Sequence, residues 1–140
     1  MGRISYLLDS NILSEPARLM PNDNVLQQLA NHDGEYATAA IVWHELVYGC
    51  ELLAASKRKK QLQSYLDMLL LNGLIVLPYD QLAADWYAIE RARLQRLGLT
   101  CAYADGEIAA IAVTQKLTLA TRNTQDFHNF QNLALQNWFD

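Results

Sequence analysis

The sequence predicts an α/β domain built around a central parallel sheet. Short apolar runs typical of buried strands alternate along the chain with longer segments whose apolar residues recur at helical spacing. The chain has 140 residues, of which 51% are hydrophobic, so it is long enough to bury one core. We therefore expect a single domain over residues 1–140.

The first half of the chain contains two expected strands. Residues 4–8 form a compact apolar run that ends abruptly at Asp9, and residues 36–40 follow a turn at Asp33 and Gly34. Apolar residues three and four apart predict the helices of this half, at 25–29 with Asn22 or Asp23 as its cap, at 42–53 and at 57–71.

In the second half of the chain, expected strands again alternate with expected helices. The apolar run 74–77 is stopped by Pro78, and Asp80 can cap a long helix that ends near Gly98. A further helix, opened by Asp105, is expected to extend through Val113. The remaining expected strands are 117–120 and 133–135.

Charge and cysteine content narrow the possible classes of protein. The net charge of −4 argues against a protein that coats nucleic acid, although a local basic surface can still bind phosphates. The two cysteines lack disulfide-framework and zinc spacing, and the apolar segments are too short for a signal peptide or a membrane span. We expect a soluble cytoplasmic protein.

Four acidic residues stand at the edges of apolar strands or helix stripes, where charges are rare unless something compensates them: Asp9, Glu45, Asp105 and Asp126. Two of them follow strands, and ligands of parallel sheets gather beyond the carboxyl ends of strands. Crowded carboxylates repel one another and need protons or cations. An all-oxygen site favours Mg²⁺ or Mn²⁺.

Each acidic residue also has a purely structural interpretation. Asp9 can begin a turn, Asp105 can cap its helix, and Asp126 can complete a capping box with Asn123. Glu45 borders an apolar helix stripe, where a glutamate is usually solvated. Glu107 lies about 200° from Asp105 on a helical wheel, so we expect it at the surface, with a metal role only if the helix begins later.

Taken together, the motifs resemble those of PIN-domain nucleases, and within them the VapC-like toxins of prokaryotic toxin–antitoxin systems. The resemblance covers essentially the whole chain. It rests on Leu-Leu-Asp-Ser-Asn-Ile at 7–12, on Glu45, on Asp105 followed by Ile-Ala-Ala at 108–110, and on Thr-Arg-Asn-Thr-Gln-Asp-Phe at 121–127. No acidic member of the family pattern is missing.

The resemblance implies a PIN-like α/β/α sandwich and an endoribonuclease that depends on Mg²⁺ or Mn²⁺. It also implies a homodimer inhibited by a cognate antitoxin; tRNA, rRNA and mRNA all fit as substrates. The residues it assigns are Asp9, Glu45, Asp105 and Asp126 for catalysis, with Asp9 and Asp105 at the metal, and Asn11, Thr121 and Asn123 as loop-ordering or hydrogen-bonding residues.

Basic residues offer candidate contacts to RNA. Arg122 lies inside the last acidic motif and is the best single candidate for the RNA backbone. The run of four basic residues at 57–60 is more typical of a solvated helix start. An alternative function is a non-catalytic protein-interaction module with the same fold.

Overall fold

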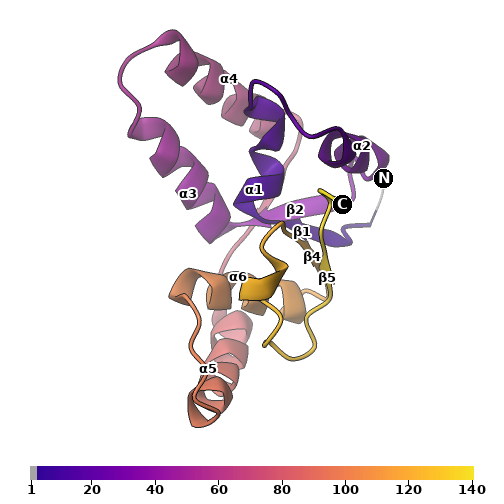
Figure 1. Ribbon diagram of the computed structural model, residues 1–140, viewed down its shortest axis with the longest axis vertical. Helices are drawn as coiled ribbons and strands as arrows, with labels where there is room; N and C mark the ends of the chain where they lie inside the picture. Colours follow the sequence, from indigo (N-terminus) through magenta and orange to yellow (C-terminus); the bar gives the residue numbers. More distant parts are fainter. Residues whose placement is uncertain (1–2) are drawn as a thin grey trace.

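The computed structural model, which describes residues 3–140, confirms the predicted α/β architecture. One sheet of five parallel strands has the order β3-β2-β1-β4-β5 (Figure 1). The strands are β1 (Tyr6–Leu8), β2 (Tyr36–Ala39), β3 (Ile75–Leu77), β4 (Thr118–Ala120) and β5 (Leu135–Gln136). From β1 the chain adds strands first on one side and later on the other, so the strand order reverses between β1 and β4.

Helices connect the strands, and most begin where the sequence supplies a cap. Asn22 accepts a hydrogen bond from the backbone N–H of Val25, and Asp80 accepts one from Ala83. The helices are α1 (Ser10–Leu13), α2 (Asp23–Asn31), α3 (Ala40–Glu51), α4 (Lys57–Leu71), α5 (Gln81–Arg96) and α6 (Tyr103–Thr114), with short 3-10 turns η1 (Glu15–Ala17) and η2 (Thr124–Asp126).

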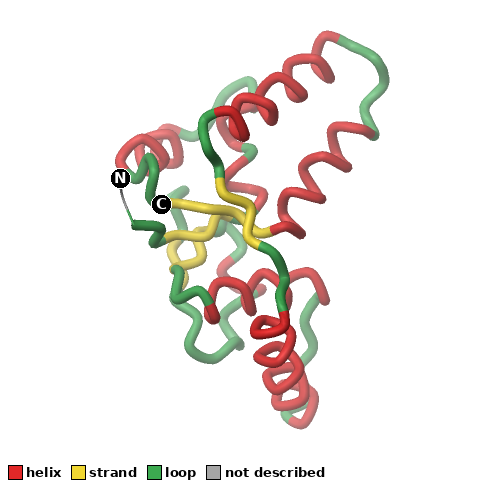
Figure 2. Tube along the Cα trace, turned by 180° about the vertical axis from the view of Figure 1, so that it is seen from behind, coloured by secondary structure: helices red, strands yellow, loops and turns green. Residues whose placement is uncertain are grey.

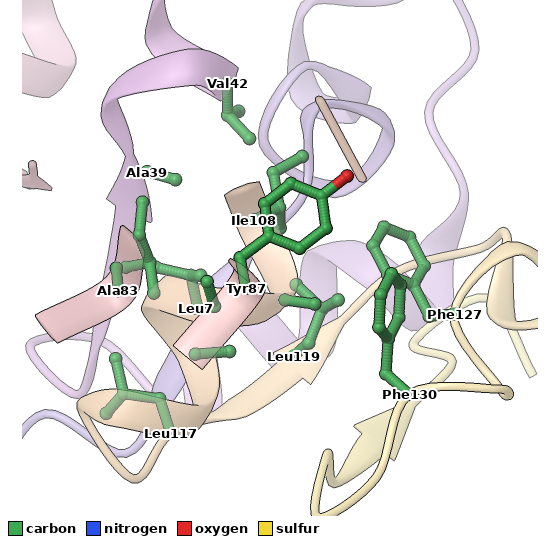
Figure 3. Close-up of a cluster of buried hydrophobic side chains, with 14 of the residues drawn as sticks. Leu7, Ala39, Val42, Ala83, Tyr87, Ile108, Leu117, Leu119, Phe127 and Phe130 are labelled. Carbon is green, nitrogen blue, oxygen red and sulfur yellow. The ribbon is translucent and has the colours of Figure 1, made fainter. Parts of the chain in front are cut away.

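The helices form two layers around the sheet. Helices α5 and α6 pack against each other on one side, and α1, α2 and α4 lie on the other (Figures 1 and 2). Helices α3 and α4 run side by side away from the sheet. The larger core joins Leu7 and Leu119 of the sheet to Ile108 of α6 and to Phe127 and Phe130 near the C-terminus (Figure 3).

A glycine lets α6 approach α5 closely. A side chain at Gly106 would overlap the ring of Tyr87, which is itself buried. This contact fixes the first turn of α6, and therefore the backbone that carries Asp105, against the α5 layer.

Several boundaries differ from the sequence prediction. Helix α6 begins at Tyr103 after Ala102, so Asp105 lies in its first turn and does not cap it. The last strand is Leu135–Gln136 because only these residues pair with β4. The short helix α1 was not expected; it forms because Asp9 caps it by accepting a hydrogen bond from the Ser10 N–H. No helix within residues 3–140 is long and apolar enough to cross a membrane.

Candidate active site

The site lies where β1 and β4 end, at the point where the strand order reverses. Asp9 directly follows β1, and Thr121 directly follows β4. The Asp9 N–H donates to the carbonyl oxygen of Ala120 at 3.0 Å, so the parallel pairing extends to the first residue of the site. Open α/β sheets bind ligands in this position, beyond the carboxyl ends of strands.

Asp9 is buried and held by hydrogen bonds on both carboxylate oxygens. The residue is only 7% exposed. Oδ1 accepts the Ser10 N–H at 2.8 Å, and Oδ2 accepts the Thr121 hydroxyl at 2.8 Å. Burial raises the pKa of Asp9 and outweighs these hydrogen bonds, which lower it, while the charge of Asp126 raises it further. The carboxylate is therefore oriented but incompletely compensated.

Thr121 and Asn11 connect the loops that follow the two strands. The Thr121 oxygen accepts the backbone N–H of Asn123 at 3.0 Å and the Asn11 Nδ2 at 3.4 Å. The Asn11 Oδ1 accepts the backbone N–H of Arg122 at 3.0 Å. Asn11 and Thr121 thus use their side chains, and Asn123 its backbone, to order the loop after β4. Any role of these three residues in catalysis stays a prediction.

Two further carboxylates lie close enough to Asp9 for their charges to interact. Burial raises the pKa of Asp105 to about 6, with contributions from the negative charges of Asp126 and then Asp9. Asp126 ends η2 and is exposed. The alternative interpretation of Asp126, as part of a capping box with Asn123, is not supported, because no side-chain hydrogen bond caps η2. Asp9 after β1, Asp105 in α6 and Asp126 in the loop after β4 therefore form one electrostatically coupled group.

Glu45 does not belong to this coupled group. It is exposed on α3, a helix that packs against both α1 and α6. Among the described residues, the charges that raise the pKa of Asp105 are Asp126 and Asp9, without Glu45. A catalytic role for Glu45 stays a prediction.

Glu107 is more buried than the sequence predicts. The helix begins earlier than predicted, at Tyr103, and Glu107 is half-buried instead of solvated. The pKa of Tyr79 is raised by burial, then by Tyr103 and by the charge of Glu107, so Glu107 lies near Tyr79. It contributes nothing to the shift of Asp105, two residues away.

The donors of the coupled group suit a hard divalent cation. All three side chains offer carboxylate oxygens, and their mutual repulsion would be relieved by positive charge. Within residues 3–140, no three Asp, Glu, His or Cys side chains converge closely enough to hold a metal by themselves. Mg²⁺ commonly takes one or two carboxylates and completes its shell with water and substrate phosphate, which fits this arrangement.

The candidate basic residues have protein contacts of their own. The Arg122 guanidinium lies 4.5 Å from the centre of the Phe139 ring, and the Arg122 side chain is exposed. In the run at 57–60, Arg58 donates to the carbonyl oxygen of Ala17 at 2.6 Å and Lys59 to that of Glu51 at 3.4 Å. That run is therefore partly used in packing α4 against its neighbours.

Two buried glutamates were missed by the sequence analysis. Glu15 is 2% exposed and accepts the backbone N–H of Asn22 at 2.8 Å and a hydrogen bond from Arg18 at 3.3 Å. Glu90 is 5% exposed and pairs with Arg93. The available signal was an Arg three residues after each Glu, a spacing that is also common on solvated helices.

Comparison with known proteins agrees with this geometry. The family model described as PIN domain matches residues 6–133. The chain is 36% identical to Toxin FitB from Neisseria gonorrhoeae, over 96% of this chain and 99% of that protein. It is 34% identical to Ribonuclease VapC2 from Rickettsia felis, over 95% and 97%. The crystal structure of FitAcB from N. gonorrhoeae superposes with a TM-score of 0.87, covering 96% of this chain and 98% of that one at 36% identity.

Proposed function

This chain belongs to the PIN domain family, and on that premise we propose that it is a metal-dependent endoribonuclease that acts as the toxin of a toxin–antitoxin pair. The similarity to a toxin and to a ribonuclease extends over nearly the whole of both chains. The observation that carries the proposal is the buried Asp9 at the strand-order reversal, electrostatically coupled to Asp105 and Asp126.

In the proposed reaction, the protein supplies a fixed and negatively charged site. Asp9 and Asp105 would hold Mg²⁺ or Mn²⁺, and Thr121 keeps the Asp9 carboxylate in one orientation through its hydroxyl. At neutral pH Asp105 is mostly ionised, because its pKa is about 6. When bound, the metal would lower the pKa of a coordinated water and stabilise negative charge on the leaving oxygen. Hydrolysis of this kind leaves a 5′-phosphate and a 3′-hydroxyl.

The proposed partners are a second copy of the chain and a cognate antitoxin. Exposed apolar side chains are available for such contacts. Leu19 and Met20 after η1 and Leu71 at the end of α4 are almost fully exposed. An antitoxin that places Arg or Lys beside Asp9 and Asp105 would neutralise the repulsion and compete with the metal.

Cleavage of RNA by the purified, antitoxin-free protein tests the proposal. Structured RNAs are incubated with Mg²⁺ or with EDTA, and the product ends are identified. We expect cleavage with Mg²⁺ alone, 5′-phosphate ends, and no cleavage by the Asp9→Asn variant. Cleavage that persists in EDTA would contradict the metal requirement. A protein that cleaves no RNA and takes up no Mn²⁺ would instead be an interaction module.

A further inference from the structure

The position of Asp126 depends on the loop that carries it. We call residues 121–131 the Asp126 loop. The Asp126 side chain is exposed, so packing does not hold its carboxylate in place. Its backbone N–H donates to the Asn123 carbonyl oxygen at 3.0 Å, and that of Phe127 donates to Thr124 at 3.1 Å. The charge of Asp126 raises the pKa of Asp9 and of Asp105, and how near its carboxylate lies to them depends on how the two ends of this loop are held.

The start of the loop is fixed by the site itself. Thr121 is fully buried, and its hydroxyl oxygen links Asp9 to the backbone N–H of Asn123. Asn11 accepts the backbone N–H of Arg122. These contacts end three residues before Asp126, so the other end of the loop needs a separate anchor.

That anchor is an ion pair on α5 between the buried Glu90 and the partly exposed Arg93. The Arg93 Nε and Nη2 donate to the two carboxylate oxygens of Glu90 at 2.6 and 2.9 Å. The same pair binds the loop backbone, because Glu90 Oε2 accepts the Gln131 N–H at 2.6 Å and Arg93 Nη2 donates to the Asn129 carbonyl oxygen at 2.8 Å. A hydrogen bond from Arg93 holds the pKa of Glu90 below its usual range. The pair is therefore charged at neutral pH.

Two buried aromatic residues connect the anchored backbone of residues 129–131 to Asp126. Phe127 and Phe130 are buried, with ring centres 6.3 Å apart, and they lie side by side in the larger core (Figure 3). The Phe130 N–H donates to the Phe127 carbonyl oxygen at 3.2 Å. Phe127 directly follows Asp126, so the chain from Asn129 back to Asp126 has little freedom to move.

The chemistry of the pair favours more than a contribution to stability. Burial of the Glu90 carboxylate costs free energy that the pairing with Arg93 must offset, and apolar residues in the same place would often stabilise the protein equally. Apolar residues cannot, however, bind a backbone N–H and a carbonyl oxygen in a fixed direction. A bidentate carboxylate–guanidinium pair can do both.

We propose that Glu90 and Arg93 are positioning residues for the nuclease site: they bind the backbone of residues 129–131 and thereby hold Asp126 beside Asp9 and Asp105. This inference rests on the proposed metal-dependent nuclease function. Neither residue touches the coupled carboxylates directly, so both act through the loop.

Arg93→Lys and Glu90→Gln test the inference, with Arg96→Lys, an exposed residue on the same helix, as the matched control. Arg93→Lys keeps the positive charge but loses the guanidinium group that donates two hydrogen bonds to Glu90. Glu90→Gln keeps the size of the side chain but loses its negative charge. Amide hydrogen exchange is measured on the metal-free proteins, and kcat, KM and the Kd for Mn²⁺ on the metal-loaded ones.

We expect the Asp126 and Phe127 amides to exchange at least about tenfold faster in both variants, while the Leu119 amide in β4 changes little. The kcat should fall by about 10- to 100-fold with little change in KM. Arg96→Lys should behave as the wild type.

An unchanged rate of amide hydrogen exchange at Asp126 would overturn the inference. A uniform increase of the exchange rate throughout the protein would also overturn it, because it would indicate an ion pair that only stabilises the fold. Unchanged kcat in both variants would also overturn it. A wild type that neither cleaves RNA nor binds Mn²⁺ would refute the proposed function instead. In that case the exchange data alone would still decide whether the pair holds Asp126.

Discussion

Substitution of Asp105 by Asn should stabilise the metal-free protein at neutral pH. The pKa of Asp105 is about 6, against an ordinary value of 3.8. The folded protein therefore binds an extra proton between about pH 4 and pH 6. The ionised carboxylate destabilises the fold above this window, and the cost disappears as the pH falls through it. Asn removes the charge and so removes the cost.

The size of the effect follows from the difference in pKa. At about 1.4 kcal/mol for each unit of pKa, the difference between 3.8 and about 6 corresponds to about 3 kcal/mol at neutral pH. Asp105 is only half-buried, so solvent screening reduces the expected gain to about 1–2 kcal/mol. For a chain of this size the Tm should rise by roughly 3 to 8 °C at pH 7.5. At pH 4 less than about a quarter of the gain should remain.

Thermal unfolding in EDTA at pH 7.5 and pH 4 provides the assay. Asp67→Asn, which removes an exposed carboxylate from α4, is the matched control and should leave the Tm nearly unchanged at both pH values. A Tm of Asp105→Asn that is lower than wild type at pH 7.5, or a gain equal at both pH values, would refute the raised pKa of Asp105.

Four further predictions follow from the site and its surroundings. Thr121→Val should cost about 1–3 kcal/mol in urea unfolding and reduce cleavage, because Asp9 and an amide N–H both lose their partner. Glu107→Gln should leave the cleavage rate close to wild type, and a rate as low as that of Asp105→Asn would contradict the assignment. Gly106→Ala should lower the free energy of unfolding by about 1–3 kcal/mol, because its side chain overlaps Tyr87. Cleavage at subsaturating Mn²⁺ should fall about tenfold per pH unit below about pH 6, as protons compete for Asp105, and a flat profile from pH 7 to pH 5 would contradict this.

The sequence was sufficient to predict the centre of the site because strand ends are visible as local patterns. An apolar run stops at Asp9 and another stops at Thr121, and parallel strands bring such ends to one edge of a sheet. Pairing of β1 with β4 then brings the Asp9 carboxylate and the Thr121 hydroxyl into contact. The predicted strand and helix types were correct for the same reason, with differences mainly at their ends.

The anchors of the site could not be predicted, because they depend on contacts between distant segments. Glu90 and Arg93 are three residues apart on α5, which on the sequence alone is typical of a solvated ion pair. Only the approach of the distant residues Asn129 and Gln131 shows that the pair binds the loop backbone, with Glu90 buried and Arg93 partly exposed. The start of α6 was similarly predicted at Asp105, since nothing local indicates that the helix begins two residues earlier.

Binding of Mn²⁺ in the absence of RNA tests whether Asp9 and Asp105 together hold the metal. The Kd is measured by electron paramagnetic resonance for the wild type, Asp9→Asn, Asp105→Asn and the double variant. If the carboxylates form one metal site, each single substitution should weaken binding by at least about tenfold, and the double variant should lose less than the two losses combined. Single variants that bind Mn²⁺ as tightly as the wild type would show that Asp9 and Asp105 do not hold the metal, and would contradict the account.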